Sequence, residues 1–226
     1  MDGVLLIDKP AGWTSHDVVA KVRGVLKAQA GQKVKVGHTG TLDPMATGLL
    51  ILVIGKYTKR AEQFSKMDKT YEAEVTLGYT STTADKEGEI TKKSAHQPNQ
   101  KEIKEVLSTF IGKIQQTPPA FSAVKVDGQR AYKAARAGKT VEIKPRNVTI
   151  YGITDVKYTY PSLKFTTKVS SGTYIRSLAE DIGQELATGA YLSALKRTQV
   201  GEFDLNNASL VSEFSTLNIQ KYLQQL

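Results

Sequence analysis

The sequence predicts a mixed fold that contains both helices and strands. Residues 15–26 and 175–186 repeat apolar side chains at helical spacing, whereas residues 70–79 alternate apolar and polar side chains, as a half-buried strand does. A glycine-rich loop at residues 37–48, GHTGTLDPMATG, leads directly into an apolar run at residues 49–54. We therefore expect one main domain in which a shaped loop precedes a buried strand.

Local composition marks the further elements in chain order. A short apolar strand is expected at residues 4–7, and Thr14 or Ser15 is a suitable N-cap for the helix that follows. Residues 80–99 are polar, and we expect them to form a long surface loop before a helix at residues 100–111. The remaining expected elements are a strand, an Asp127-Gly128 turn and a basic helix-like segment within residues 118–138, strands at residues 148–153 and 164–169, and a helix from residue 173 to before Gly189.

Composition limits what the chain can do. The 226 residues include no cysteine, which excludes disulfides and thiolate metal sites, and the three histidines are scattered without metal-ligand spacing. We therefore expect no bound metal ion. The apolar run at residues 4–7 is too short for a signal peptide or a membrane span, which predicts a cytoplasmic protein that does not enter the membrane.

The net charge of +9 is unevenly distributed along the chain. Residues 9–35 and 125–146 each carry a net charge of +5, which leaves the rest of the chain close to neutral. Such concentrated positive charge suits a polyanion, most simply a nucleic acid. A solvated lysine-rich face explains the charge equally well, because a basic composition is a weak indicator of the partner.

Asp43 is the candidate catalytic group of the glycine-rich loop. Pro44 restricts Asp43 to an extended conformation, so the loop is expected to present the carboxylate. Such a carboxylate can be a nucleophile, a base or a metal ligand, but Asp-Pro is also a common turn former, and the loop alone favours the turn. Arg176 lies in the first turn of an expected helix, where the helix dipole opposes a cation, so Arg176 should have an anionic partner.

Six blocks of sequence follow one another along almost the whole chain: DKPAGWTS at residues 8–15, GHTGTLDPMATGLL at 37–50, KTYEAEVTLG at 69–78, PPAFSAVKVDGQRAYKAAR at 118–136, SSGTYIRSLAEDIG at 170–183 and LKRTQVGEF at 195–203. In this order and spacing they closely resemble the bacterial TruB-type tRNA pseudouridine synthases. The resemblance implies an α+β pseudouridine synthase fold, a mixed and mainly antiparallel sheet flanked by helices with a central active-site cleft. It also implies isomerisation of uridine to pseudouridine at position 55, in the T-loop of tRNA, by base flipping and without a cofactor.

The resemblance assigns roles to particular residues. Asp43 matches the catalytic aspartate, and Arg176 matches an active-site arginine that would hold Asp43 and lower its pKa. Tyr71 matches a tyrosine that would stack on the base and assist proton transfer. His38 matches a histidine that stacks where the flipped nucleotide leaves the RNA, and Leu195 matches an apolar residue that contacts the base. On pattern alone, Tyr71 and Leu195 would be packing residues and His38 would be solvated.

Basic side chains are expected to hold the phosphates beside the flipped uridine, namely Lys9, Lys125, Arg130 and Lys133. The expected partner is the T-arm stem-loop of tRNA, bound by a monomer that requires no protein partner. Residues 1–205 are expected to form the catalytic domain, and residues 206–226 a short tail that packs on the core, with no PUA domain.

Two other functions stay open. A guide-RNA-dependent synthase of the archaeal and eukaryotic type shares the Asp-containing block and relies on partner proteins, although residues 37–50 resemble the stand-alone bacterial form more closely. A non-catalytic tRNA-binding or tRNA-folding protein could keep the same scaffold, but binding alone does not need Asp43, Tyr71 and Arg176 together. The sequence also leaves open whether the aspartate adds to C6 of the base or acts at the ribose, for instance through a glycal.

Overall fold

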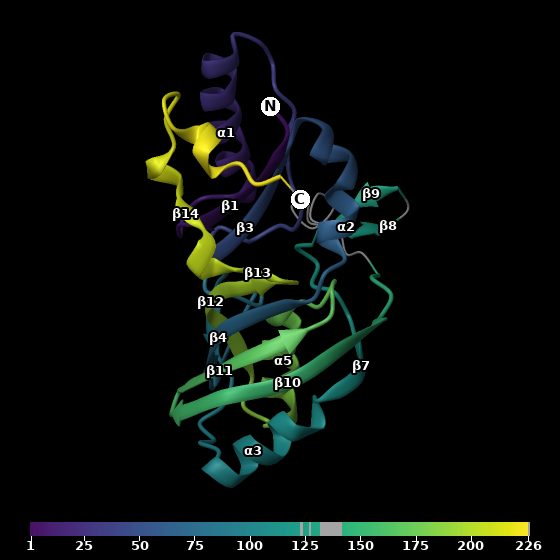
Figure 1. Ribbon diagram of the computed structural model, residues 1–226. Helices are drawn as coiled ribbons and strands as arrows, with labels where there is room; N and C mark the ends of the chain where they lie inside the picture. The colour runs from purple at the N-terminus through teal and green to yellow at the C-terminus, as the bar shows by residue number, and fades with distance from the viewer. Residues whose placement is uncertain (123, 127, 132–141, 226) are drawn as a thin grey trace. The chain divides into compact units, whose positions relative to one another are not determined.

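The computed structural model describes residues 1–122, 124–126, 128–131 and 142–225 (Figure 1). The chain forms two compact units. The first unit consists of Met1–Tyr71 and Leu195–Leu226, and the second of Glu72–Ala194. Two strands, β4 (Lys69–Leu77) and β12 (Ala190–Val200), each continue from one unit into the other along the chain.

The first unit is built on β1 (Gly3–Lys9) and β3 (Thr47–Ile54), which pair antiparallel over their full length. Three further strands extend this sheet. The short strand β2 (Val36–His38) pairs antiparallel with β3, β14 (Ser209–Leu210) pairs parallel with β1, and β12 pairs parallel with β3. Because it contains both kinds of pairing, the sheet is mixed, as the family resemblance implies.

Strand β3 is buried along almost its whole length, which explains its uninterrupted apolar sequence. One face of the sheet packs in a cluster that contains Leu49, Ile51 and Val53 of β3 together with Phe64 and Phe203. Phe64 lies on the short helix α2 (Ala61–Ser65), which follows the 3-10 turn η1 (Gly55–Arg60), and Phe203 on β13 (Phe203–Asp204). Each aliphatic side chain buried in this way contributes about 1.5–3 kcal/mol to folding.

Helix α1 (Ser15–Ala30) lies beside β1 in Figure 1 and buries the stripe formed by Val18, Val19, Val22 and Leu26. Thr14 caps its first turn in a reciprocal arrangement with Asp17, and the hydrogen bonds from Thr14 lower the pKa of the Asp17 carboxyl. The helix ends at Gly31, whose φ of 66° lies in the left-handed region that glycine tolerates best. The predicted helix and its cap are confirmed.

The C-terminal segment packs on the first unit through buried side chains, Val211, Phe214 and Ile219. A β-bridge between Val4 and Gln224 adds backbone hydrogen bonds, and the rings of Phe214 and Tyr222 meet edge to face at 5.2 Å. The 3-10 turns η2 (Leu205–Asn207), η3 (Val211–Glu213) and η4 (Ile219–Tyr222) shape this segment.

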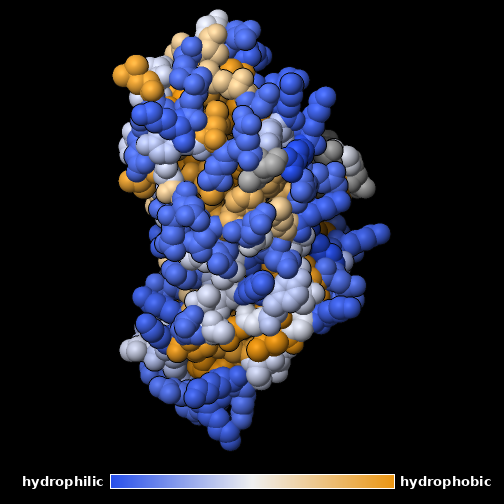
Figure 2. Space-filling view, viewed as in Figure 1, coloured by the Kyte–Doolittle hydropathy of each residue, from blue (hydrophilic) through white to orange (hydrophobic). Residues whose placement is uncertain are grey.

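In the second unit the strand order is β12, β4, β11 (Ser162–Val169), β10 (Arg146–Thr159) and β7 (Gly112–Gln116). Helices α3 (Gln100–Thr109) and α5 (Ile175–Glu185) contact each other, and α3 also contacts β10. Asn99 caps α3 with a reciprocal contact from Glu102. In Figure 2 an apolar area lies over β10, which carries the exposed side chains of Tyr151 and Val156.

The long surface loop expected at residues 80–99 is wrong. Strands β5 (Tyr79–Ser81) and β6 (Ile90–Lys92) pair antiparallel in this region, and the turn between them buries Ala84 and Asp85. Most of the segment is exposed, as its polar composition indicates, but Ser81 and Asp85 are buried. The strand expected before the Asp127-Gly128 turn is present as β8 (Lys125–Val126), but the turn leads into a second strand, β9 (Gln129–Arg130), which pairs antiparallel with it. The helix-like segment expected after it lies largely outside the described residues.

Candidate active site

The loop that carries Asp43 lies between β2 and β3 and is held by Arg197 of β12. The Arg197 side chain is almost fully buried. Its Nε donates to the carbonyl oxygen of Leu49 at 2.7 Å, and its Nη2 donates to the carbonyl oxygen of Gly40 at 3.0 Å. Because Gly40 precedes Asp43 and Leu49 follows it, a single guanidinium ties together both ends of the loop.

Two further contacts fix the residues on either side of Asp43. The Ser15 hydroxyl accepts a hydrogen bond from the Leu42 N–H at 2.8 Å and lies 3.1 Å from the Leu42 carbonyl oxygen, to which it can donate. The N–H of Gly12 donates to the carbonyl oxygen of Pro44 at 2.8 Å. The Ala46 N–H closes a turn onto the carbonyl of Asp43 itself at 3.0 Å. The loop backbone around the half-buried Asp43 is therefore defined by contacts from residues far apart in the sequence.

Lys9 also supports this loop. Its side chain is completely buried, and its Nζ lies 2.9 Å from the carbonyl oxygen of Pro10, 2.5 Å from that of Trp13 and 3.4 Å from that of Pro44. This burial speaks against the phosphate contact expected for Lys9, because a phosphate would need an accessible ammonium group. The sequence shows a lysine beside a turn but gives no signal that the fold encloses it.

The three other expected site residues of the first unit occupy different environments. Tyr71 is buried in β4, with 8% of its surface exposed. His38 ends β2 and is half-buried, and its ring centroid lies 5.3 Å from that of His16 on α1, in an edge-to-face arrangement. Leu195 is half-buried in β12. The catalytic and base-binding roles expected for these residues stay predictions.

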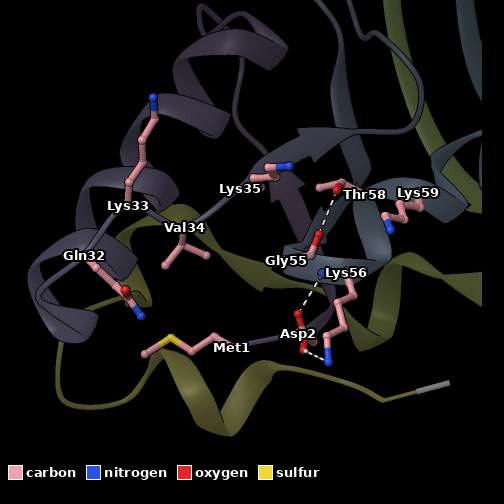
Figure 3. Close-up of a pocket in the computed structure, with 10 residues that line it drawn as sticks. All are labelled: Met1, Asp2, Gln32, Lys33, Val34, Lys35, Gly55, Lys56, Thr58 and Lys59. Atoms are coloured by element: carbon pink, nitrogen blue, oxygen red, sulfur yellow. Dashed lines mark hydrogen bonds and ion pairs between the residues drawn. The ribbon is translucent and has the colours of Figure 1, made fainter.

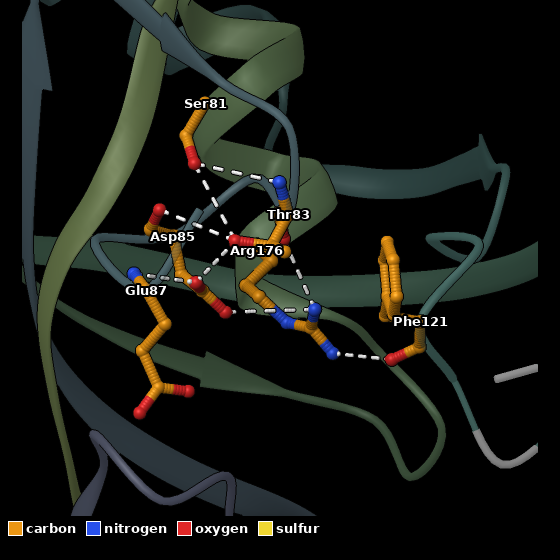
Figure 4. A network of polar contacts seen from close by, with 6 residues as sticks. All are labelled: Ser81, Thr83, Asp85, Glu87, Phe121 and Arg176. Carbon is orange, nitrogen blue, oxygen red and sulfur yellow. Dashed lines mark hydrogen bonds and ion pairs between the residues drawn. The ribbon is translucent and has the colours of Figure 1, made fainter. Parts of the chain in front are cut away.

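Arg176 lies in the first turn of α5 in the second unit, and its guanidinium is buried among acceptors (Figure 4). Its Nη1 lies 3.6 Å from Oδ2 of Asp85 and donates to the carbonyl oxygen of Thr83 at 3.1 Å. Its Nη2 donates to the carbonyl oxygen of Phe121 at 2.8 Å. The expected anionic partner of Arg176 is confirmed, and within this unit it is Asp85. The pairing of Arg176 with Asp43 stays a prediction.

Asp85 is a site residue that the sequence analysis misses. Its Oδ1 accepts hydrogen bonds from the Thr83 hydroxyl at 2.6 Å and from the Glu87 N–H at 3.0 Å (Figure 4). The preceding residue, Ala84, has a φ of 63°, a left-handed conformation that costs a non-glycine residue about 1–2 kcal/mol. The buried ion pair and its hydrogen bonds maintain this strained turn, and strain of this kind is common at functional sites.

The start of α5 is fixed without a side-chain N-cap. Instead, the Gln116 amide forms two hydrogen bonds with the backbone of Tyr174, accepting from its N–H at 2.8 Å and donating to its carbonyl at 3.0 Å. Ser177 donates to the carbonyl oxygen of Thr117 at 2.8 Å. One turn beyond Arg176, burial and the neighbouring Asp181 raise the pKa of Glu180 to about 7, while Arg176 opposes the shift.

The expected RNA-binding residues of the second basic segment are only partly described. Lys125 and Arg130 are directly paired in the β8–β9 hairpin, so that the backbone brings two basic positions together. Lys133 lies outside the described residues. Within the described part of the chain, no group of three or more His, Cys, Asp or Glu side chains is placed to hold a metal ion. The described helices include none that is both long and apolar enough to span a membrane.

Two family models match this chain from residue 24 to residue 225. The N-terminal domain of the TruB family pseudouridylate synthases matches residues 24–175, and the C-terminal domain of tRNA pseudouridylate synthase B matches residues 176–225. The chain belongs to the TruB family. Proteins named tRNA pseudouridine synthase B are 44% identical in Thermobifida fusca, over 95% of this chain and 74% of that protein, and 45% identical in Aquifex aeolicus, over 99% and 77%.

Solved structures support the same fold. The TruB-family chain aligns with a chain in the crystal structure of a Cbf5-Nop10-Gar1 complex with a TM-score of 0.70 and 31% identity, covering 93% of this chain and 53% of that one. A chain in the structure of an H/ACA RNP bound to a substrate RNA containing 2'-deoxyuridine aligns with a TM-score of 0.68 and 27% identity, over 93% and 51%. The chain thus spans about half the length of these structural neighbours. The predicted pseudouridine synthase fold is confirmed.

Proposed function

We propose that this protein isomerises uridine to pseudouridine at position 55, in the T-loop of tRNA, with Asp43 as the nucleophile. The observation that carries the proposal is the family match along the chain, together with two curated relatives at 44% and 45% identity that are named tRNA pseudouridine synthase B. The geometry of the Asp43 loop supports it. Side chains from α1 and β12 hold the backbone on both sides of Asp43, as a positioned catalytic group requires.

The chemistry needs one well-placed carboxylate. Pseudouridine forms when the N1–C1′ glycosidic bond breaks, the uracil turns and C5 bonds to C1′, after which C5 loses its proton and N1 takes one up. The atoms of the substrate are rearranged without net oxidation or reduction, so the reaction as written requires no cofactor. The Asp43 carboxylate would act in its ionised form, either by addition to C6 of the base or at the ribose.

The proposal assigns the remaining site residues as the family resemblance implies. Arg176 holds the Asp43 carboxylate and keeps it ionised, Tyr71 stacks on the base and assists proton transfer, and His38 and Leu195 contact the flipped nucleotide. The buried position of Arg176 favours such a role, because a guanidinium already removed from water interacts more strongly with a second carboxylate. A monomeric state and a cytoplasmic location belong to the same proposal.

Guide-RNA-dependent activity is the second candidate, favoured by the likeness to the Cbf5 chain at 31% identity. The higher identity of the curated tRNA synthases, 44% and 45%, favours action on tRNA without a guide. A non-catalytic tRNA-binding role is the third candidate. A single experiment on bare tRNA separates all three.

The test measures tritium release from unmodified tRNA labelled at uridine C5, in the absence of guide RNA. We expect the wild-type protein to release tritium and Asp43→Asn to be slower by at least about 10³-fold, since the amide removes the nucleophile but not the loop. Both proteins should bind the tRNA with similar affinity. Turnover by Asp43→Asn near the wild-type rate would contradict the nucleophile assignment, and binding without turnover by the wild type would favour a guide-dependent or non-catalytic protein.

A further inference from the structure

The first unit contains a hollow of about 330 Å³ at the end of its sheet opposite the Asp43 loop (Figure 3). The antiparallel register of β1 and β3 aligns Gly3 with Ile54 at the hollow, and Lys9 with Gly48 at the loop. The eight residues of β3 separate these two ends, which corresponds to roughly 23 Å at the usual rise of a strand. The hollow is therefore distinct from the residues assigned to catalysis.

Positive charge dominates the lining of this hollow. Lys33, Lys35, Lys56 and Lys59 line it together with one carboxylate, that of Asp2. Asp2 is already engaged, because its Oδ1 accepts the backbone N–H of Lys56 at 2.7 Å and its Oδ2 lies 3.9 Å from the Lys56 ammonium. In the part of the chain that the structure describes, no carboxylate lies within ion-pair distance of Lys35 or Lys59.

The lining combines basic and apolar side chains. In Figure 3, Lys35 and Lys59 lie on the same side of the hollow as Thr58, whereas Lys33 extends away from it. The side chains of Val34 and Met1 supply the apolar part of the lining. An anionic group that is attached to an apolar body would match both parts of this surface.

The backbone holds the hollow in a defined shape. The N–H of Gly55 donates to the carbonyl oxygen of Lys35 at 2.9 Å, and the Thr58 hydroxyl donates to the carbonyl oxygen of Gly55 at 2.7 Å. Gly55 has a φ of 60°, and a Cβ at this position would overlap Asp2 and Met1. Only glycine allows this close approach. The segment that carries Lys35 and the segment that carries Lys56 and Lys59 are therefore fixed beside each other at one corner of the sheet.

We propose that this hollow binds the phosphodiester backbone of the substrate RNA, at a point distant from the target uridine. The inference rests on the proposed function, because only a polynucleotide can reach the Asp43 loop and the hollow at once. Ammonium groups form charge-assisted hydrogen bonds with phosphate oxygens, and the apolar side chains of Val34 and Met1 can contact a ribose or the edge of a base. Contacts of this kind add affinity and fix the position of the RNA without reading its sequence.

The experiment compares two double charge reversals in the full chain. Lys35→Glu with Lys59→Glu changes the hollow, while the control Lys104→Glu with Lys157→Glu changes the net charge equally at exposed positions of the second unit. The Kd for unmodified tRNA is measured between low and physiological salt. We expect the hollow variant to bind tRNA roughly ten-fold more weakly, with a salt slope reduced by about 1.5, and the control to stay near wild type.

A short RNA distinguishes local from distant contacts. A hairpin that holds the target loop on only three base pairs is too short to span roughly 23 Å from the Asp43 loop. We expect both double variants to bind and turn over this hairpin as the wild type does, and the hollow variant to keep the wild-type kcat on saturating tRNA. An equal loss of tRNA affinity in the two variants would overturn the proposal, because it would indicate an effect of net charge.

A binding measurement with inorganic pyrophosphate tests whether the hollow binds a small free anion instead of RNA. If the hollow variant loses pyrophosphate binding but binds tRNA as the wild type does, the site takes a free anion and the RNA assignment is overturned. Absence of wild-type turnover on tRNA would instead contradict the proposed function. The two failures are distinguishable, because the first is a binding result obtained with an active enzyme.

Discussion

Buried polar contacts hold both the Asp43 loop and the Arg176 cluster, but they end on backbone atoms in the loop and on a side chain in the cluster. Around Asp43, the contacts from Ser15 and Arg197 reach the backbone of neighbouring residues. At Arg176, the contacts end on the guanidinium itself, and Asp85 balances its charge. The supports of the loop can therefore be changed without altering the Asp43 carboxylate itself, whereas removal of Asp85 leaves the buried charge of Arg176 less well balanced.

Removal of the Asp85 carboxylate should have the largest effect on stability. Asp85→Ala removes the carboxylate that forms an ion pair with the buried Arg176 guanidinium, and breaking a buried ion pair from one side typically costs 3–5 kcal/mol. We expect the free energy of unfolding in urea to fall by about that amount. Arg176→Met combined with Asp85→Ala should recover part of the loss, because the double variant removes both charges of this pair.

The matched control is an exposed pair in the same unit. Lys101 and Glu105 of α3 lie 3.7 Å apart with most of their side-chain surface in water, so Glu105→Ala should cost less than about 0.5 kcal/mol. If Asp85→Ala and Glu105→Ala were equally mild, the buried pair would not organise the second unit, and the contrast with the Asp43 loop would disappear.

Replacement of Arg197 tests the loop by its effect on catalysis. Arg197→Lys keeps the positive charge but cannot bond the carbonyls of Gly40 and Leu49 with one planar group. We expect kcat to fall about 10²-fold with little change in KM, because a displacement of about 1 Å at a catalytic group costs this much. Steady-state kinetics on unmodified tRNA gives both values.

The neighbouring residue Lys196 is exposed and serves as the control, since Lys196→Gln changes the same strand without altering the hydrogen bonds of the Arg197 guanidinium. A variant Arg197→Lys with the wild-type kcat would mean that the loop keeps its shape without this clamp. A rise in KM with an unchanged kcat would indicate that Arg197 contributes to RNA binding and not to the positioning of the loop.

Ser15 should contribute less than Arg197, because it fixes one residue of the loop and carries no charge. Ser15→Ala leaves the buried N–H and carbonyl of Leu42 without their partner, at a cost of about 1–3 kcal/mol in the free energy of unfolding. The exposed Ser108 of α3, whose hydroxyl donates to the carbonyl of Glu105, is the comparison. Ser108→Ala should change stability by less than about 0.5 kcal/mol, and equal effects at the two serines would contradict the assignment.

The sequence predicts well the features that depend on local pattern. The helix at Ser15–Ala30 follows from its apolar spacing and from Thr14, and the strand Thr47–Ile54 follows from its uninterrupted apolar run. The requirement that Arg176 have an anionic partner follows from its place in a first helical turn, and the structure confirms the requirement. These predictions need only neighbours along the chain.

Features that depend on distant pairing are not predictable in this way. Asp85 lies in a polar stretch that resembles a surface loop, and only the fold brings it to Arg176. Lys9 appears as an exposed basic residue beside a turn, but Pro10, Trp13 and Pro44 enclose its ammonium group. In both cases a charged side chain is buried because the fold supplies partners that no local pattern reveals.

The smallest expected effect concerns Lys69 of β4, which contrasts with the paired charge of Arg176. Burial lowers the pKa of Lys69 to about 8, and the nearby charge of Arg197 adds to the shift. Its ammonium donates to the carbonyl oxygens of Ser65 and Met67. Among the described residues no carboxylate lies within ion-pair distance of this ammonium, and the charge of Asp68 only partly opposes the shift. A lowered pKa means that the folded chain binds the proton more weakly than the unfolded chain.

Between pH 8 and the ordinary lysine pKa of 10.5, the unfolded chain binds more protons, so this lysine makes stability rise with pH. The unfolding free energy of the wild type relative to Lys69→Met should therefore increase from pH 8 to 10, by less than about 1.4 kcal/mol per pH unit. The exposed Lys66, paired with Glu62, gives the control Lys66→Met, which should show no such trend. A flat difference for Lys69→Met would mean that the two carbonyls and Asp68 together stabilise the ammonium as fully as water does. A buried cation in the first unit would then need no direct ion pair, unlike Arg176 in the second.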